Sequence, residues 1–369
     1  MRPLLNPALR RTWRDETTMQ LGTDPARAVV LTGVDAATRR LLAALDGTRS
    51  TADVVALGVR LGVPVGQVHR LLDLLDEAGA LVDAAAAPPA GRPGLRARLA
   101  PELAALTLAD PEGAGDALAR RRAARVRVVG LGRVGAGAAL LLAAAGVGSV
   151  LPQDPRPLTP ADVPPAGLPP AFGRPRQEVV EQALAQPAPE ASSATGGRGP
   201  DPEGTVTGAP AVERGWPNAE PADVVLLSPT GPGARADPLD VHPLLRAGTP
   251  HLLAAVRERV GVVGPFVVPG LSACLRCLDL HRTDRDPRWP LVAAQLGADR
   301  TGDPGTGACA AAVAGATASI AVLQVLAWLD TGTLPVTASA TLEVDETGQV
   351  RRRAWSVHPG CGCDWAEAG

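Results

Sequence analysis

The stretch RVRVVGLGRVGAGAAL, residues 125–140, constrains the fold more than any other part of this 369-residue chain. A short apolar run ends in a G-x-G-x-x-G motif formed by Gly130, Gly132 and Gly135, and an alanine- and leucine-rich segment follows. This order predicts a strand, a tight turn and a helix. Glycines let the backbone approach a diphosphate, and the helix N-terminus supplies N–H donors to it. The motif therefore predicts a nucleotide-binding type of domain.

The motif leaves the nucleotide open. Asp154 follows Gly135 by 19 residues (154 − 135), where the carboxylate at the end of the second strand of such a domain bonds a ribose hydroxyl. This arrangement fits NAD or FAD about as well as ATP. It also fits a sheet that keeps its glycine turn and binds no nucleotide, because a single G-x-G-x-x-G is a weak signal.

The second part of the chain, residues 125–369, alternates strand-like and helix-like patterns. Its strand candidates are residues 126–130, 148–153, 222–228 and 249–256. Such alternation predicts an α/β fold with a doubly wound, Rossmann-like parallel sheet. A hairpin with its turn at 346–348 follows, and residues 186–221, rich in Pro, Gly, Ala and Ser, are interpreted as a flexible surface insertion.

Residues 1–85 are interpreted as a small separate α+β domain. Two short strand candidates, at 12–22 and 26–34, precede three short helical segments and a closing strand. Asp35 and Thr51 are placed to cap the first two helices. The order of elements predicts a winged helix-turn-helix, and residues 86–124 are expected to form a linker with a helix.

Charge and composition exclude several functions. The formal net charge of −2 and a pI near 6.2 give no global basic field. The third helical segment of the first domain offers only His69 and Arg70 near its start, so we expect no nucleic-acid binding. Residues 308–329 carry no charge and are long enough to span a membrane, but their alanine-rich composition favours a buried core helix. With no signal peptide, we expect a cytoplasmic protein without membrane contact.

Four of the five cysteines form two close pairs. Cys274 and Cys277 make a C-x-x-C motif, and Cys361 and Cys363 make a C-x-C motif. In a reducing compartment, two such pairs favour one structural zinc ion with four thiolate ligands over the alternatives of a disulfide or unrelated thiols. Zinc would hold the C-terminal segment onto the domain. His281 and His358 lie near the pairs, but four thiolates already saturate the zinc.

Cys309 is the remaining cysteine. It could act as a nucleophile that takes an acyl group as a thioester. It could equally be a small apolar residue in an alanine-rich helix, and the absence of an evident base beside it in the sequence favours that interpretation.

The second domain resembles the ThiF/MoeB/HesA superfamily, the adenylating fold shared with ubiquitin-activating enzymes. The resemblance rests on the glycine turn, Asp154, the stretch VGVVGPFVVPG at 260–270 and the two cysteine pairs, in that order. It covers roughly residues 125–365. It implies binding of ATP and Mg²⁺, adenylation of the C-terminal carboxylate of a partner protein, and a homodimer formed through this domain.

Several positions depart from the superfamily's catalytic pattern. Arg133 stands where the middle glycine of the turn would be, and Arg176 occupies the place comparable to a lysine near the triphosphate. The chain contains no lysine at all, and no carboxylate follows the strand at 222–228 until Asp237. Arg133 and Arg176 are candidate phosphate contacts, but loss of the metal carboxylate and the lysine predicts a degenerate ATP site.

The first domain resembles the PqqD-like domain that recognises leader peptides in the maturation of ribosomal peptides. There a leader peptide adds a strand to the edge of the sheet and rests against the third helix. Fused to a ThiF-like domain, it resembles the leader-binding partners of YcaO-type, azoline-forming cyclodehydratases. No cyclodehydratase domain fits within this chain, so the cyclodehydratase would act in trans.

These observations favour a protein that binds a leader peptide and presents it to a modifying enzyme. Two other hypotheses stay open. One is a working adenylating enzyme in which Arg133 or Arg176 replaces the usual cation at the phosphates. The other is an NAD-linked oxidoreductase. The glycine motif and Asp154 support it, but the sequence offers no catalytic acid or base that can be named.

Overall fold

The computed structural model describes residues 1–86, 93–164, 167–185, 221–230, 235–297 and 308–363. The chain divides into two compact units, Met1–Arg120 and Arg121–Gly369, and each is described by itself. The interpretation of residues 186–221 as an insertion lies outside the described residues, apart from Pro221.

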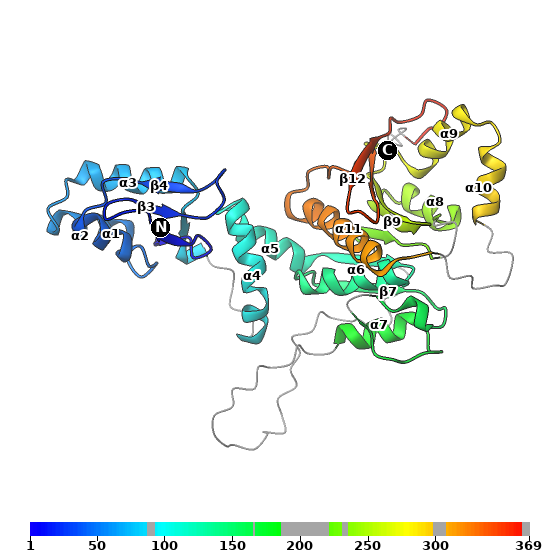
Figure 1. The fold of residues 1–369 in the computed structure, drawn as a ribbon, viewed down its shortest axis with the longest axis horizontal. Helices are drawn as coiled ribbons and strands as arrows, with labels where there is room; N and C mark the ends of the chain where they lie inside the picture. The colour runs from blue at the N-terminus through cyan, green and yellow to red at the C-terminus, as the bar shows by residue number, and fades with distance from the viewer. Residues whose placement is uncertain (87–92, 165–166, 186–220, 231–234, 298–307, 364–369) are drawn as a thin grey trace, which may run out of the picture. The chain divides into compact units, whose positions relative to one another are not determined.

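The first unit combines two small sheets with short helices (Figure 1). Its elements are β1 (Pro3–Leu5), β2 (Arg11–Trp13), β3 (Met19–Leu21), β4 (Val29–Leu31), α1 (Ala36–Ala44), α2 (Thr51–Arg60), α3 (Val65–Glu77), β5 (Leu81–Asp83), η1 (Ala84–Ala86), α4 (Pro93–Ala109) and α5 (Ala114–Ala123), which continues to the start of the second unit. Strands β2, β3 and β4 form an antiparallel sheet with β3 in the middle, and β1 pairs with β5. The three helices and the closing strand β5 follow the predicted order, whereas β1 is not among the predicted strands and the candidate strand at 12–22 is divided into β2 and β3.

Helix starts in this unit follow local capping chemistry. Asp35 accepts a hydrogen bond from Thr38 N (2.7 Å) at the start of α1, as predicted. The prediction that Thr51 caps α2 is wrong, because the cap is Ser50, whose hydroxyl accepts from Asp53 N (3.2 Å). The Asp53 carboxylate in turn accepts from Ser50 N (3.1 Å), which completes a capping box and places Thr51 inside the helix.

Helix α4 belongs to the first unit. The Asn6 side chain donates to the Thr107 carbonyl (3.2 Å), and Arg27 donates to the Leu108 carbonyl (3.0 Å). The segment predicted as a linker with a helix therefore contains a 17-residue helix bonded to the first unit.

The second unit is built on a seven-stranded sheet with the order β12-β11-β10-β9-β8-β6-β7. Its elements are β6 (Arg125–Val129), α6 (Arg133–Ala144), β7 (Ser149–Gln153), η2 (Pro160–Asp162), α7 (Arg176–Ala185), β8 (Val224–Leu227), α8 (Pro238–Arg246), β9 (His251–Arg257), β10 (Val260–Val267), α9 (Leu275–Arg285), α10 (Trp289–Gly297), α11 (Ala311–Thr331), β11 (Ala340–Val344) and β12 (Val350–Ala354). The four predicted strands appear as β6 to β9.

The sheet is mixed rather than wholly parallel. Strands β7, β6, β8 and β9 are parallel, whereas β9 to β12 are antiparallel neighbours. Only Glu258 and Arg259 connect β9 to β10, and a connection this short can join only antiparallel strands. The prediction of a doubly wound α/β sheet is confirmed, with an antiparallel half that the strand pattern alone does not define.

Helices cover both faces of this sheet. Helices α6 and α11 lie together over one face, where Val126, Leu226 and Ala254 point into the largest core (Figure 1). Helices α8 and α9 contribute to a second apolar cluster on the other face, with Val225 and Leu253.

Helix α11 is apolar and long enough to cross a membrane by length and composition alone, and no other helix in the described residues is. Ten of its residues are buried against the rest of the unit, and Gln324 accepts a hydrogen bond from Thr337 Oγ1 (3.1 Å). The helix thus packs as the predicted core helix.

Candidate functional site

The glycine turn between β6 and α6 is shaped by backbone packing. Gly130 has a φ of 87°, and a Cβ there would lie 2.1 Å from the Ser228 carbonyl oxygen. A Cβ on Gly135 would lie 1.9 Å from the Gly130 oxygen, and one on Gly132 would lie 2.5 Å from the Thr230 methyl group. The close approach of the end of β8 and of the first turn of α6 therefore requires these glycines whether or not a nucleotide binds.

Asp154 lies at the end of β7, as predicted, and is buried at 2% exposure. Its Oδ2 accepts from Leu131 N (2.9 Å), Arg156 Nη2 (2.9 Å) and Arg176 Nη1 (3.2 Å). Its Oδ1 accepts from the backbone N (3.1 Å) and Nε (2.8 Å) of Arg156. A carboxylate offers about four acceptor positions, so five donors leave none for a ribose hydroxyl.

Arg176, the first residue of α7, is also engaged within the chain. Its Nη2 donates to Asp162 Oδ2 (2.8 Å), while Nη1 reaches Asp154 and, at 3.5 Å, the Thr230 hydroxyl. The side chain is buried between these two carboxylates. The predicted phosphate contact therefore lies beside the glycine turn, but its charge is already compensated.

Arg133 connects two loops. Its Nε donates to the Ala161 carbonyl (2.8 Å), and its Nη1 donates to the Cys309 carbonyl (2.8 Å). Cys309 itself is partly buried and packs against the main core. Burial raises the pKa of the Cys309 thiol, although the charge of Arg133 opposes this, so the less reactive thiol form is favoured.

The carboxylates near β8 have structural partners. Asp223 lies before the strand and accepts from Arg125 N (2.8 Å). Asp237 caps α8 and accepts from Leu239 N (2.8 Å). In the described stretch 221–230, no carboxylate follows the strand. An Mg²⁺ ligand is therefore not found at the position where the superfamily has one.

Sequence reasoning missed two members of this cluster, Arg156 and Asp162. Both lie in the stretch DPRPLTPAD that follows β7. Asp162 forms a capping box with Thr159, and T-P-A-D is a local signal for that arrangement. Arg156 stands two residues after Asp154, close enough for its backbone N–H and side chain to donate to that carboxylate. Nothing in the sequence, however, distinguishes it from an exposed arginine.

The four paired cysteines meet at one point on the second unit. The Sγ–Sγ distances are 3.8 Å from Cys274 to Cys277, 3.5 Å from Cys274 to Cys361 and 3.3 Å from Cys277 to Cys363. All four sulfurs lie within 4.8 Å of one another. Zn–S bonds of about 2.3 Å in a tetrahedron place sulfurs about 3.8 Å apart. The donor set and its spacing therefore fit a zinc ion.

Local hydrogen bonds favour a thiolate in this cluster. The Cys274 thiol and the His358 backbone N–H (3.4 Å) both donate to Cys277 Sγ. Together with Cys363 they lower the pKa of Cys277, against the effect of burial, while the same contact raises the pKa of Cys274. A thiolate, the form that a metal requires, is therefore favoured within the cluster.

The two nearby histidines bond elsewhere. His358 Nε2 lies 3.0 Å from Asp284 Oδ2, and its Nδ1 accepts from Gly360 N (3.0 Å). His281 Nε2 lies 3.0 Å from the Ser356 carbonyl oxygen, to which it donates. The rings brace the segment that carries Cys361 and Cys363, and with Asp284 they form a second group whose possible ligand atoms lie within 4.8 Å of one another.

Sequence comparison identifies the class of protein that this fold and these sites define. The sequence profile of the ThiF family matches residues 104–363, well over half of the chain. The chain therefore belongs to the ThiF family, and the predicted resemblance is confirmed. No curated protein matched the chain by sequence.

Solved structures extend the likeness to almost the whole chain. Escherichia coli MccB with ATP is 12% identical, and the match covers 98% of this chain and 99% of that one at a TM-score of 0.67. The microcin C7 biosynthetic enzyme MccB in complex with N-formylated MccA is 13% identical, with 99% and 100% covered and a TM-score of 0.63. A heterocyclase in complex with substrate and cofactor is 15% identical, with 96% of this chain and 38% of that chain covered and a TM-score of 0.57. At these identities the likeness shows the fold.

The ion pairs of Asp154 predict an acid dependence of stability. Burial would raise the pKa of Asp154, but Arg156, the Leu131 N–H and Arg176 outweigh it, and the pKa is lowered. Because the pKa of Asp154 is lower in the folded state than in the unfolded state, its ionised form stabilises the fold. This stabilisation is fully present above the unfolded-state pKa of about 3.9 and is lost as the pH falls through the folded-state pKa. At pH 7, Asp154→Asn should lower the free energy of unfolding by about 3 kcal/mol, because it leaves buried Arg176 undercompensated.

Denaturant unfolding at a series of pH values measures both effects. The Asp154→Asn protein should lose less stability than the unchanged protein between roughly pH 4 and pH 2. Asp116→Asn, at an exposed position on α5, serves as the control and should follow the unchanged protein. Parallel pH profiles for the Asp154→Asn and unchanged proteins would contradict the prediction.

Proposed function

We propose that this ThiF-family protein binds the leader peptide of a ribosomally made precursor and presents it to a modifying cyclodehydratase that acts in trans. The first unit would hold the leader, and the second unit would dock the modifying enzyme. The proposal includes a degenerate ATP site, a structural zinc ion, a homodimer and a cytoplasmic location. The MccB structure with MccA and the heterocyclase structure with substrate are relatives in fold whose bound molecules fit such a role.

The hydrogen bonding of the Asp154 carboxylate is the observation that supports a binding role rather than catalysis. Its carboxylate is saturated by Leu131 N–H, Arg156 and Arg176. The cation expected at the phosphates, Arg176, is shared between Asp154 and Asp162. Adenylyl transfer needs cations directed at the phosphates and a carboxylate for the metal. Arg176 is paired with two carboxylates of this chain instead, and in the described stretch 221–230 no carboxylate follows β8.

The first unit has an open strand edge that suits a peptide. In β2–β3, Arg14 N donates to Thr18 O and Gly22 N donates to Arg10 O. Along an antiparallel strand, successive residues direct their N–H and C=O groups to opposite sides. The backbone groups of Met19 and Leu21 therefore point toward β4. The N–H and C=O of Val30, paired opposite Gln20, therefore point away from β3, as β-strand addition requires.

An adenylating enzyme is the second candidate function. The match to MccB with ATP covers nearly all of both chains, and the glycine turn is retained. In this alternative, ATP would have to displace Arg156 or Arg176 from Asp154. A titration with ATP separates the two functions directly.

We predict that ATP with Mg²⁺ does not bind. Calorimetric titration of the zinc-loaded protein should give no heat, and its melting temperature should not shift at about 1 mM ATP. A dissociation constant of 10 μM would instead stabilise the protein by about 2.7 kcal/mol at that concentration. Micromolar binding by the unchanged protein would refute the degenerate site.

Arg156→Ala, which removes two donors from Asp154 while retaining the turn, is the informative variant, since a gain of ATP binding would show that Arg156 prevents it.

We predict that the leader binds at the β4 edge. Val30→Pro removes the outward N–H that a paired strand needs, and should weaken binding of the fluorescently labelled leader at least tenfold, measured by anisotropy. The leader for this test is to be sought among short open reading frames beside this chain's gene. Trp13→Pro, on the opposite edge strand β2, is the matched control and should change the affinity less than threefold. Equal binding by both variants would exclude strand addition at β4.

We predict one zinc ion per chain, held by Cys274, Cys277, Cys361 and Cys363. Cys361→Ser should reduce the bound zinc, measured by elemental analysis, to a small fraction, because a hydroxyl is a much poorer zinc ligand than a thiolate. It should also lower the melting temperature, because metal binding is coupled to folding of the C-terminal segment. Cys309→Ser should retain the full zinc content, and zinc-free unchanged protein would contradict the assignment.

A further inference from the structure

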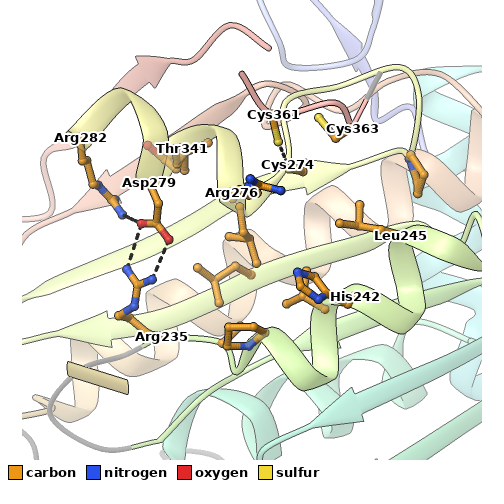
Figure 2. A pocket seen from close by; sticks show the side chains of 18 of the residues that line it. Arg235, His242, Leu245, Cys274, Arg276, Asp279, Arg282, Thr341, Cys361 and Cys363 are labelled. Atoms are coloured by element: carbon orange, nitrogen blue, oxygen red, sulfur yellow. Dashed lines mark hydrogen bonds and ion pairs between the residues drawn. The ribbon is translucent and has the colours of Figure 1, made fainter. Parts of the chain in front are cut away.

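A cavity of about 1130 Å³ lies on the face of the sheet that α6 and α11 do not cover (Figure 2). Leu253 and Ala255 of β9 form part of its floor, whereas Leu252 and Ala254 point into the α6/α11 core. Alternate residues of a strand face opposite sides of a sheet. Helices α8, α9 and α10 supply the walls, and the paired cysteines lie at one end.

The charge of this cavity is strongly positive. Five arginines line it, namely Arg235, Arg246, Arg257, Arg276 and Arg282, together with one carboxylate, Asp279. Arg235 (2.6 and 3.0 Å) and Arg282 (3.2 Å) already share that carboxylate (Figure 2). Arg246 and Arg276 make no ion pair with any residue that the structure describes. Since the whole chain carries a net charge of −2, this excess of cations is a local property of the site.

The positive charge continues along the same face of the sheet. In the β11–β12 pairing, Glu343 lies opposite Arg351, and Thr341 lies opposite Arg353. Thr341 lines the cavity, and period-two alternation puts Glu343 and its arginine partners on that face as well. Glu343 is shared by Arg351 (2.6 Å), Arg353 (3.7 Å) and Arg257 (3.9 Å). As at Asp279, a single carboxylate is paired with several guanidinium groups.

The floor of the cavity is aliphatic rather than aromatic. Leu245, Leu253, Ala255, Val262 and Leu278 line it. Apart from the imidazole of His242, its aromatic ring is that of Trp289, over which guanidinium groups already lie, Arg282 at 5.0 Å and Arg235 at 5.7 Å from the ring centre. Nucleic acids bind through free aromatic faces as well as through cations. An aliphatic floor beneath an arginine rim instead matches an apolar side chain flanked by carboxylates.

We propose that this cavity is a docking site for an acidic peptide segment of a partner protein, with an apolar side chain of that segment in the cavity and its carboxylates on Arg246, Arg276 and the neighbouring arginines. The site is separate from the β4 edge proposed for the leader. It goes beyond the proposed function because it assigns a chemical class to what the second unit binds. Failure at either site leaves the other test unaffected.

The experiment uses the full chain and a defined probe. The probe is a fluorescein-labelled octapeptide with six acidic residues around one leucine and one phenylalanine, titrated by anisotropy. A second peptide, in which the acidic residues are replaced by lysine, and an unlabelled single-stranded DNA 12-mer as competitor complete the set. We expect binding of the acidic probe that weakens as salt is raised, with no binding of the basic peptide.

The variant Arg246→Glu with Arg276→Glu should weaken the acidic probe at least tenfold. Arg288→Glu makes the same charge change at an exposed residue outside the cavity and should change the affinity less than twofold. Circular dichroism and the melting temperature check folding, and Arg276→Gln alone replaces the double variant if that protein is not folded. Equal loss in the Arg288→Glu protein, or equal binding of the basic peptide, would overturn the proposal. So would displacement of the probe by the oligonucleotide at a lower concentration than by unlabelled acidic peptide.

Discussion

The buried carboxylate of Asp154 is the interaction on which the carboxyl edge of the parallel strands depends. It accepts hydrogen bonds from Leu131 in the glycine turn, from Arg156 in its own loop and from Arg176 at the start of α7. One side chain therefore positions the turn, the loop and the helix that surround a nucleotide in folds of this type. A buried charge is costly unless it is paired, so the carboxylate and the two arginines hold one another in place. The edge keeps its shape without the charge of a ligand.

The parts of the fold that the sequence predicts well are those with a steric or geometric requirement in few residues. Gly130 and Gly135 are needed because a side chain would collide with backbone oxygens, and that requirement is visible as a motif. The cysteine pairs are visible because two thiols must leave one turn toward one centre, which restricts their spacing. Apolar runs identify β6 to β9, most clearly β8, in which all four residues are apolar and buried, because a strand covered on both faces needs continuous apolar residues.

The parts that escaped the sequence-based predictions depend on pairings that the apolar pattern alone does not specify. The antiparallel half of the sheet follows from the two-residue connection after Arg257, while the apolar pattern there also fits a parallel strand. Arg176 could be predicted near the turn, but not its pairing with Asp162, which lies 14 residues earlier. Ser50 and Thr51 are both good caps by type, but Asp53 stands three residues after Ser50, so the S-T-A-D spacing is a local signal for Ser50 that the prediction of Thr51 did not use. For the antiparallel half of the sheet and for Arg176, the deciding partner is chosen by the folded backbone.

Arginine carries every permanent positive side-chain charge in this chain, because lysine is absent. Its role therefore depends on how many acceptors surround it. Around Asp154 and Asp162 the acceptors match the guanidinium groups, and the arginines stabilise the fold. In the cavity, Asp279 is one carboxylate among five arginines. A guanidinium group presents five donors in a fixed fork, and those of Arg246 and Arg276 have no carboxylate within the described residues. Among the described residues, a structural arginine thus differs from Arg246 and Arg276 by having a carboxylate acceptor, and our proposal is that an acidic peptide supplies that acceptor in the cavity.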